Sequence, residues 1–213
     1  MAVRCWFCDV RPLSDEALFA RGMRELPWAE RREKVLRYRF EKDRILSLGA
    51  GLLLAGMLQE YGVRDLTVHA LPEGKLVLTN CPQVHFSLSH SGTLAVAAVS
   101  DLPVGVDTEI LSDVDSRILS YAFQTSEQEW VRKSDDPGRA FFRLWTRKES
   151  YLKRLGIGFS VPPDSFSVLP DEPMPDGSTF SEWEERGHLI CLSTEQAEKV
   201  ELREYSLFST KTE

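Results

Sequence analysis

The order of the expected helices and strands is the feature that most limits the fold. After a first strand, each half of the chain has its helices grouped together and its strands following, which argues against the strand–helix alternation of a Rossmann fold. Hydrophobic periodicity and helix-end signals predict helices over residues 15–23, 28–39, 43–61, 116–122, 126–133 and 138–155. Strands are expected over residues 4–10, 66–69, 75–78, 84–88, 94–100, 104–110, 166–168, 180–183, 188–193 and 200–207.

This order predicts an α+β protein with largely antiparallel sheets. The similar order of elements in both halves favours a tandem pseudo-repeat, although no repeat of fixed period is visible. We place the boundary between an N-terminal half, 1–103, and a C-terminal half, 104–213. Two local details are also expected: Ser14 as the N-cap of the first helix, and a turn over residues 90–93 with Gly92 at its centre.

The negative charge of the chain is concentrated at one end. The formal net charge is −7, which argues against a general nucleic-acid binder. Residues 164–213 carry 4 basic and 12 acidic side chains, whereas residues 1–163 carry 22 basic and 21 acidic ones. We therefore expect the acidic surplus to face solvent, away from any site that binds anions.

Neither a secretory signal nor a membrane-spanning segment is recognisable, so we expect a cytoplasmic protein. The four cysteines are Cys5, Cys8, Cys81 and Cys191. Cys5 and Cys8 have C-x-x-C spacing, but no βαβ unit precedes them, and no second Cys/His pair completes a zinc site. We interpret all four as ordinary thiols.

Two segments carry carboxylates in a pattern that suits a metal. Asp107 and Glu109 alternate on an expected strand, so both point to the same face, where they repel each other unless a cation lies between them. On the expected helix 138–155, Trp145, Glu149 and Lys153 share a face that borders the apolar stripe. Packed together, these elements predict a magnesium site, because magnesium prefers oxygen ligands. The alternatives are a solvated strand pair and a surface Glu149–Lys153 ion pair.

Ser89 and His90 form the third candidate. As neighbours on a strand they point to opposite faces, which makes them a poor nucleophile–base pair for a hydrolase. A hydroxyl, an imidazole and turn amides suit phosphate binding better. A basic segment, 24–44, has a net charge of +3 and offers further cations for phosphate, although most of its side chains fit a solvated helix face.

These segments together resemble a known family. The runs FSLSHSG (86–92), VGVDTE (104–109) and LWTRKESYLK (144–153), followed by Gly156 and Gly158, are similar in order and interval to the Sfp-type 4′-phosphopantetheinyl transferases. The resemblance spans most of the chain and fades after about Val168. It implies two similar α+β halves in a pseudo-twofold arrangement, with coenzyme A and magnesium in the cleft between them.

The resemblance also implies roles for individual residues. It implies transfer of the phosphopantetheine arm of coenzyme A to a serine of an apo acyl or peptidyl carrier protein, with release of 3′,5′-ADP. Asp107, Glu109 and Glu149 then correspond to the metal centre, and Lys153 to the group that neutralises phosphate charge, with Asp107, Glu149 and Lys153 as the catalytic residues. The coenzyme A ligands would be Ser89, His90, Lys75, Arg44, Arg31 and Lys34. The expected partners are coenzyme A and a carrier protein, without nucleic acid, membrane or a second subunit.

Two residues depart from the family pattern. Thr108 replaces an apolar residue but points away from the expected metal, and Leu76 replaces the proline that commonly follows Gly74-Lys75. Two other functions remain open: a non-catalytic module that senses coenzyme A or binds carriers, and a Ser/His hydrolase. The pathway of the carrier and the tolerance of acyl-coenzyme A are also open.

Overall fold

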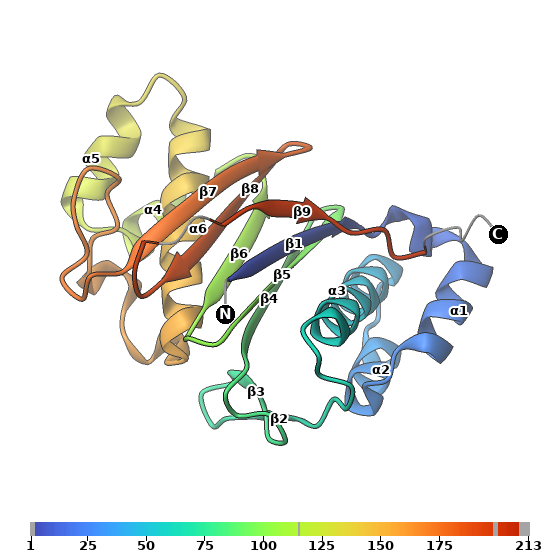
Figure 1. Ribbon diagram of the computed structural model, residues 1–213. Helices are drawn as coiled ribbons and strands as arrows, with labels where there is room; N and C mark the ends of the chain where they lie inside the picture. The colour runs from blue at the N-terminus through green and yellow to red at the C-terminus, as the bar shows by residue number, and fades with distance from the viewer. Residues whose placement is uncertain (1–2, 115, 198–199, 209–213) are drawn as a thin grey trace.

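The structure is a computed structural model that describes residues 3–114, 116–197 and 200–208 (Figure 1). The first half contains, in chain order, β1 (Arg4–Asp9), the 3-10 turn η1 (Arg11–Ser14), α1 (Glu16–Glu25), α2 (Ala29–Arg37), α3 (Glu41–Glu60), β2 (Val68–Ala70), β3 (Leu76–Leu78), β4 (His85–Ser91) and β5 (Leu94–Ser100). The second half contains β6 (Gly105–Ile110), α4 (Ser116–Ala122), α5 (Thr125–Lys133), α6 (Pro137–Leu155), the 3-10 turns η2 (Gly158–Ser160) and η3 (Pro163–Ser165), β7 (Thr179–Glu185), β8 (His188–Thr194) and β9 (Leu202–Glu204). All the expected helices are present.

The strands form three sheets in the described part of the chain. A four-stranded sheet has the order β4-β5-β1-β9, a three-stranded sheet has the order β6-β8-β7, and β2 pairs with β3. Every pairing is antiparallel except that of β1 with β9. The prediction of an α+β protein with largely antiparallel sheets is therefore confirmed.

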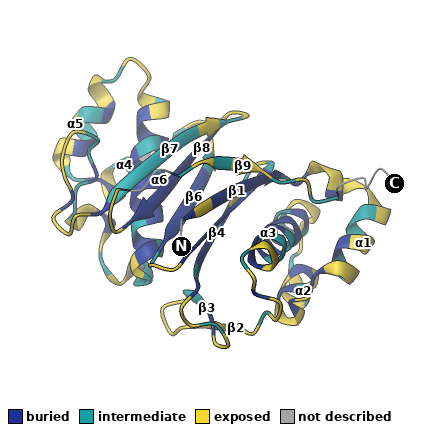
Figure 2. Ribbon diagram, viewed as in Figure 1, coloured by how far each residue is buried: buried dark blue, intermediate teal, exposed yellow. Residues whose placement is uncertain are grey.

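Two groups of helices enclose the strands (Figure 1). α1, α2 and α3 lie on one side of the molecule, and α4, α5 and α6 lie on the other. α3 packs on the four-stranded sheet and α6 packs on β6 and β8. Figure 2 shows the strands mostly buried and the exposed residues concentrated on the helices and loops. The site elements β4, β6 and α6 thus contact one another between the two groups of helices, since α6 and β4 both pack on β6.

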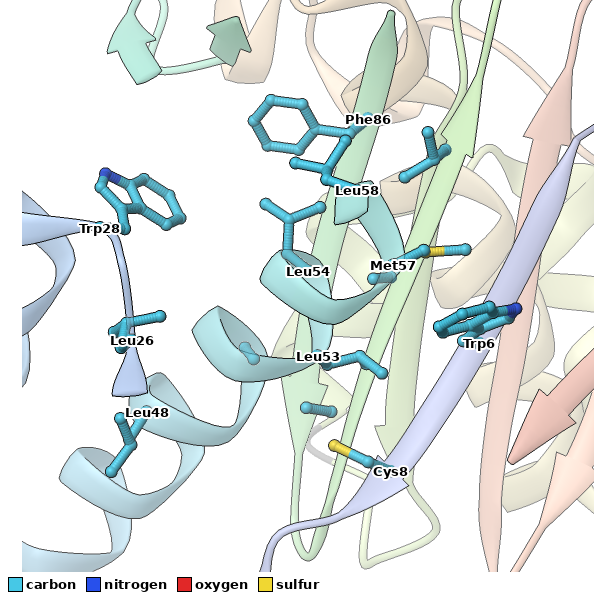
Figure 3. Close-up of a cluster of buried hydrophobic side chains, with 14 of the residues drawn as sticks. Trp6, Cys8, Leu26, Trp28, Leu48, Leu53, Leu54, Met57, Leu58 and Phe86 are labelled. Atoms are coloured by element: carbon cyan, nitrogen blue, oxygen red, sulfur yellow. The ribbon is translucent and has the colours of Figure 1, made fainter. Parts of the chain in front are cut away.

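α3 is apolar around most of its circumference because it is covered from several directions. Its Leu53, Leu54 and Met57 are fully buried, and they pack with Trp6 of β1 and Phe86 of β4 (Figure 3). A largely apolar helix is stable only when neighbours cover most of its surface, and here α1, α2 and the sheet do so.

A second core lies between the two larger sheets. Alternate residues of β1 point in opposite directions, so Trp6 faces α3 whereas Phe7 packs with Val106 of β6 and Ile190 of β8. Every residue of β5 is buried because this strand has a core on both faces. The apolar contacts between the sheets hold β6 against the N-terminal half.

Two local predictions were wrong. Asp15, not Ser14, is the N-cap of α1, and its carboxylate accepts a hydrogen bond from the Leu18 amide at 2.9 Å. His90 and Ser91 are not in a turn, because β4 continues through both and pairs with β5. The turn is shorter, at Gly92-Thr93, and Gly92 has the positive φ of 54° that its position requires.

The strand expected at residues 166–168 does not form, because buried side chains bind this backbone instead. Lys148 donates to the Phe166 carbonyl at 2.5 Å, and Arg147 donates to the Val168 carbonyl at 2.7 Å. The Val168 amide donates to the carboxylate of Glu127 at 2.9 Å. Glu127 and Lys148, both at most 1% exposed, also form an ion pair at 2.8 Å.

The last described strand returns to the first sheet. β9 pairs with β1, so the end of the C-terminal half, which we drew at 104–213, adds a strand to the N-terminal sheet.

No helix in the described ranges combines the length and apolar content needed to cross a membrane.

Burial raises the pKa of the Cys5, Cys8 and Cys191 thiols far above the usual range, which makes these thiols unreactive.

Candidate active site

Asp107 and Glu109 of β6 lie on the wall of one cavity, as their alternation on a strand predicts. The cavity has a volume of about 470 Å³. It is lined by Arg31, Lys34, Leu76, Leu88, Ser89, His90, Asp107, Glu109, Trp145, Glu149 and Lys153. Asp107 is 3% exposed and Glu109 is partly buried. The solvated strand pair considered from the sequence is therefore wrong for Asp107.

α6 brings Glu149 and Lys153 to the same cavity. The helix approaches β6 very closely at Gly105, where a Cβ atom would overlap the carbonyl oxygen of Ser150 and the amide nitrogen of Arg154. Only glycine allows this contact. α6 then ends at Gly156, which adopts a left-handed conformation with φ 71°.

Lys153 binds Asp107 rather than its helical neighbour Glu149. Its ammonium group lies 2.5 Å from Asp107 Oδ1 and 3.0 Å from Ser89 Oγ. Ser89 Oγ in turn donates to Asp107 Oδ1 at 2.7 Å. These contacts join three elements, β4, β6 and α6, at one carboxylate oxygen. Lys153 therefore takes part in the site and not in a surface ion pair.

The carboxylates share a strongly perturbed electrostatic environment. Burial first, and then the charge of Asp107, raises the pKa of Glu149 to about 7. Burial also raises the pKa of Glu109, against hydrogen bonds from Ser91 and Trp145 that lower it. A carboxyl group with a pKa near neutrality in a cavity is typical of a general acid or base.

The side chains of this cavity include candidate ligands for a metal ion. Within the described residues, no group of three or more His, Cys, Asp or Glu side chains already converges as a closed metal site would. Asp107 Oδ2, however, is buried and has no hydrogen-bond partner among the described residues. Two further carboxylates line the same cavity. The donor chemistry fits magnesium, with the ammonium of Lys153 beside Asp107 in this structure.

Basic side chains also line the cavity. Arg31 and Lys34 of α2 and His90 of β4 all line it. Arg31 is held in place by a hydrogen bond to the Ser47 carbonyl at 3.1 Å and by the ring of Trp28. Two causes lower the pKa of His90 to about 4: the larger is burial of the imidazole away from water, and the next is the positive charge of Arg31. His90 is thus neutral near pH 7 although part of its ring is exposed.

Lys75 and Arg44 stand apart from this group. The Lys75 ammonium donates to the Arg154 carbonyl at 2.6 Å, and burial lowers its pKa to about 8. It lines an adjoining cavity of about 260 Å³ that shares Glu149 and Lys153 with the first. Arg44 donates to the Tyr38 carbonyl at 2.7 Å and lines neither cavity.

Ser89 and His90 do not form a nucleophile–base pair. Ser89 is buried and bound to Asp107, whereas residue His90 is exposed, as opposite faces of a strand require. The structure therefore gives no support to a Ser/His hydrolase.

The sequence reasoning missed Ser91 as a site residue. Its hydroxyl donates to Glu109 Oε2 at 2.7 Å. The signal was present in the serines at 87, 89 and 91, which must share one face of a strand. The assumed turn at residues 90–93 hid it.

Comparison with known proteins decides the family. The sequence profile of the 4′-phosphopantetheinyl transferase superfamily matches residues 103–207. The 4′-phosphopantetheinyl transferase ffp of Bacillus subtilis is 32% identical over 163 residues, which cover 74% of this chain and 72% of that protein. This chain belongs to the 4′-phosphopantetheinyl transferase family. The resemblance inferred from the three motifs is thereby confirmed.

Other family members match shorter parts of the chain. The 4′-phosphopantetheinyl transferase Sfp of Bacillus subtilis strain 168 is 31% identical over 144 residues, 65% of this chain and 64% of that protein. The 4′-phosphopantetheinyl transferase HetI of a Nostoc species is 38% identical over 95 residues, 41% of this chain and 40% of that protein. The matches therefore extend beyond one genus of bacteria.

Proposed function

We propose that this protein transfers the 4′-phosphopantetheine arm of coenzyme A to a serine of an apo acyl or peptidyl carrier protein. The proposal rests on the side chains that line one cavity, in a chain that belongs to this family. Carboxylates and Lys153 form one part of its wall, and Arg31, Lys34 and His90 form another. A multiply phosphorylated substrate needs both a cationic wall and a centre that neutralises its pyrophosphate.

The substrates and the groups at the site account for every bond and proton of the proposed reaction. The serine oxygen of the carrier forms a bond to the phosphorus that bears the pantetheine. The bond from that phosphorus to the bridging oxygen breaks, and 3′,5′-ADP leaves with the electron pair. The serine proton passes to Glu149, directly or through water, because a carboxylate with a pKa of about 7 can accept it near neutrality. Lys153 neutralises the charge that develops on the phosphate oxygens.

Magnesium would be held by Asp107, Glu109 and Glu149. When bound, it supplies charge neutralisation at the pyrophosphate oxygens. The orphaned Asp107 Oδ2 supports this assignment, because a buried carboxylate oxygen without a hydrogen-bond partner is costly unless a cation satisfies it.

Arg31, Lys34 and His90 would hold the 3′-phosphate and its neighbours. His90 would donate a hydrogen bond as a neutral imidazole, and Ser89 would contribute its hydroxyl. Lys75 fits a contact from the adjoining cavity. Arg44 would have to leave the Tyr38 carbonyl to reach a phosphate, so its role has the least support.

The decisive experiment incubates the protein with coenzyme A, magnesium and a panel of apo carrier proteins. We expect a carrier to gain the mass of one phosphopantetheine group, with 3′,5′-ADP in equal amount. Glu149→Gln and Asp107→Ala should fold and lose transfer. Full activity in either variant would contradict the assigned centre. Coenzyme A binding without transfer to any carrier would instead favour a sensing module.

We also propose that the protein is a cytoplasmic monomer, as we expect from its sequence. Fatty-acid, polyketide and nonribosomal-peptide carriers all belong in the panel. Acyl-coenzyme A should be offered beside coenzyme A, because the adjoining cavity contains Leu76, Phe86, Leu88 and Leu152.

A further inference from the structure

β4 and β6 pack side by side although they belong to different sheets (Figure 1). No backbone ladder joins these two strands, so side chains must fix how one lies against the other. Three alternate serines of β4, namely Ser87, Ser89 and Ser91, all point toward β6, and we call them the serine ladder. Because strand residues alternate between faces, three serines at this spacing form a single row.

Each member of the ladder bonds to a different point of β6. Ser87 Oγ accepts a hydrogen bond from the Val106 amide at 3.0 Å. The next member, Ser89, donates to Asp107 Oδ1 at 2.7 Å. The third, Ser91, donates to Glu109 Oε2 at 2.7 Å. The ladder therefore ends on the two carboxylates of the cavity.

Ser91 holds its carboxylate from a fixed position. Its hydroxyl also accepts a hydrogen bond from the Ile110 amide at 3.2 Å. A hydroxyl has one hydrogen to donate, so acceptance from Ile110 leaves that hydrogen for Glu109. Glu109 is thus oriented by a hydroxyl that the Ile110 amide itself holds in place.

His188, from a third strand, supports the end of the ladder at Ser91. This residue of β8 is 1% exposed, and its Nε2 lies 3.0 Å from the Ser91 carbonyl oxygen and 3.3 Å from the Thr93 nitrogen. Its Nδ1 lies 3.0 Å from the Arg186 carbonyl oxygen. A Cβ at Gly92 would approach Nε2 to 2.6 Å, so the turn rests directly on the imidazole.

We propose that Ser91 is the positioning residue for Glu109, and that His188 fixes the end of β4 from which Ser91 acts. The inference rests on the proposed function in one respect, that Glu109 helps to hold a divalent cation. Removal of a hydrogen-bond partner from a metal-binding side chain typically lowers metal affinity about 10- to 100-fold. Neither Ser91 nor His188 touches the reacting atoms, so their loss should act on the cation and not on coenzyme A.

The test uses the full chain and Mn²⁺ as the probe, titrated by calorimetry in the presence of coenzyme A. Ser91→Ala should weaken Mn²⁺ binding about 10-fold or more. Its coenzyme A KM should stay within about 3-fold of wild type, since Ser91 lines neither cavity of the site. Ser91→Thr keeps the hydroxyl and should restore Mn²⁺ affinity. The Ile110 amide should exchange its hydrogen faster in Ser91→Ala than in Ser91→Thr.

Thr194→Val is the matched control. Thr194 lies at the opposite end of β8 from His188, and its hydroxyl is 3.0 Å from that of Thr179. This variant loses a cross-strand hydroxyl contact far along the same sheet and should keep wild-type Mn²⁺ affinity. His188→Gln should weaken Mn²⁺ binding as Ser91→Ala does. If His188→Gln fails to fold, the Mn²⁺ affinities of Ser91→Ala and Ser91→Thr alone test the proposal.

Equal Mn²⁺ affinity in Ser91→Ala and wild type would overturn the inference, as would equal weakening in Ser91→Ala and Ser91→Thr. Absence of Mn²⁺ binding by the wild-type protein would overturn it as well. A wild-type protein that binds Mn²⁺ but modifies no carrier would overturn only the proposed function.

Discussion

At the residue scale, Glu149 is a carboxyl group that the folded protein makes harder to ionise. Its pKa rises from 4.5 to about 7, through burial and then the charge of Asp107. Ionised Glu149 therefore destabilises the fold, and the loss develops as pH rises from about 4.5 to about 7. At about 1.4 kcal/mol for each pKa unit, the loss above that range is at most about 3.5 kcal/mol.

Glu149→Gln removes this ionisation and should change the pH dependence of stability. Without divalent cations, the variant should melt at a higher temperature than wild type at about pH 8, with little difference at about pH 5. Melting curves at both pH values measure the effect. Identical shifts at both would show that Glu149 does not titrate in this range.

His90 should act on substrate binding more than on chemistry. A phosphate contact remote from the reacting phosphorus stabilises ground state and transition state alike, so its loss raises KM and leaves kcat nearly unchanged. We expect His90→Ala to raise the coenzyme A KM about 10-fold, the effect of about 1.4 kcal/mol. A fall in kcat with unchanged KM, measured by steady-state kinetics, would place His90 at the reaction centre instead.

At the scale of elements, the contact of β6 with α6 decides whether the carboxylates meet. Gly105→Ala would drive a methyl group into the backbone of α6 at Ser150 and Arg154. Backbone cannot move aside as a side chain can, so we expect a loss on the order of 3 kcal/mol in the free energy of unfolding. Transfer should fall with it, because Glu149 and Lys153 would move away from Asp107.

Gly138→Ala is the matched control for this prediction. Gly138 lies in the first turn of α6, and its Cβ position has only the Asp136 carboxylate nearby, at 3.6 Å. Alanine favours a helix over glycine by up to about 1 kcal/mol, so this variant should be neutral or more stable. Urea denaturation of both variants makes the comparison. Similar stabilities would show that β6 and α6 tolerate separation.

The elements and the sites were not equally predictable from the sequence. Hydrophobic period and helix-end signals located all the helices, and alternation put Asp107 and Glu109 on one face. Local patterns say nothing about strands from different sheets that pack together. The contact of β4 with β6 therefore became visible only in the fold.

Long-range side-chain bonds explain the error at residues 166–168. Residues 166–168 look like a strand because they are apolar, yet Lys148 and Glu127 take up their backbone groups. Lys75 reaches the Arg154 carbonyl across 79 positions of sequence. The division at residue 103 and the pseudo-twofold relation of the halves stay predictions.

At the scale of the whole molecule, the acidic segment behaves in part as expected. None of its described acids lines either cavity of the site. Several of them are not simply solvated, however, because Glu182 pairs with Arg143 at 2.9 Å and Asp176 with Arg154 at 2.8 Å. The segment thus neutralises arginines on α6, and none of its described residues forms an ion pair with the cations of α2.

Those cations adjoin an exposed apolar pair. Leu36 is 64% exposed and Phe40 is 56% exposed, and both follow Lys34, which lines the cavity. Arg37, Arg39 and Lys42 of the same segment are exposed, as are Glu33 and Glu41, and the Arg39 guanidinium lies over the Phe40 ring. If the proposed function holds, exposed apolar side chains beside positive charges would suit an acidic carrier protein that presents its serine to the cavity.

Leu36→Glu and Phe40→Glu should therefore raise the KM for the carrier about 10-fold or more, because each removes apolar contact and adds repulsion. The KM for coenzyme A should not change, since neither residue lines a cavity. Tyr121→Glu is the control, because Tyr121 is 70% exposed on α4, away from α2. Added salt should raise the wild-type carrier KM by screening the same charges. If Tyr121→Glu weakens carrier binding as strongly as Leu36→Glu and Phe40→Glu do, the carrier docks elsewhere, and the acidic segment then shapes no binding surface at residues 36–40.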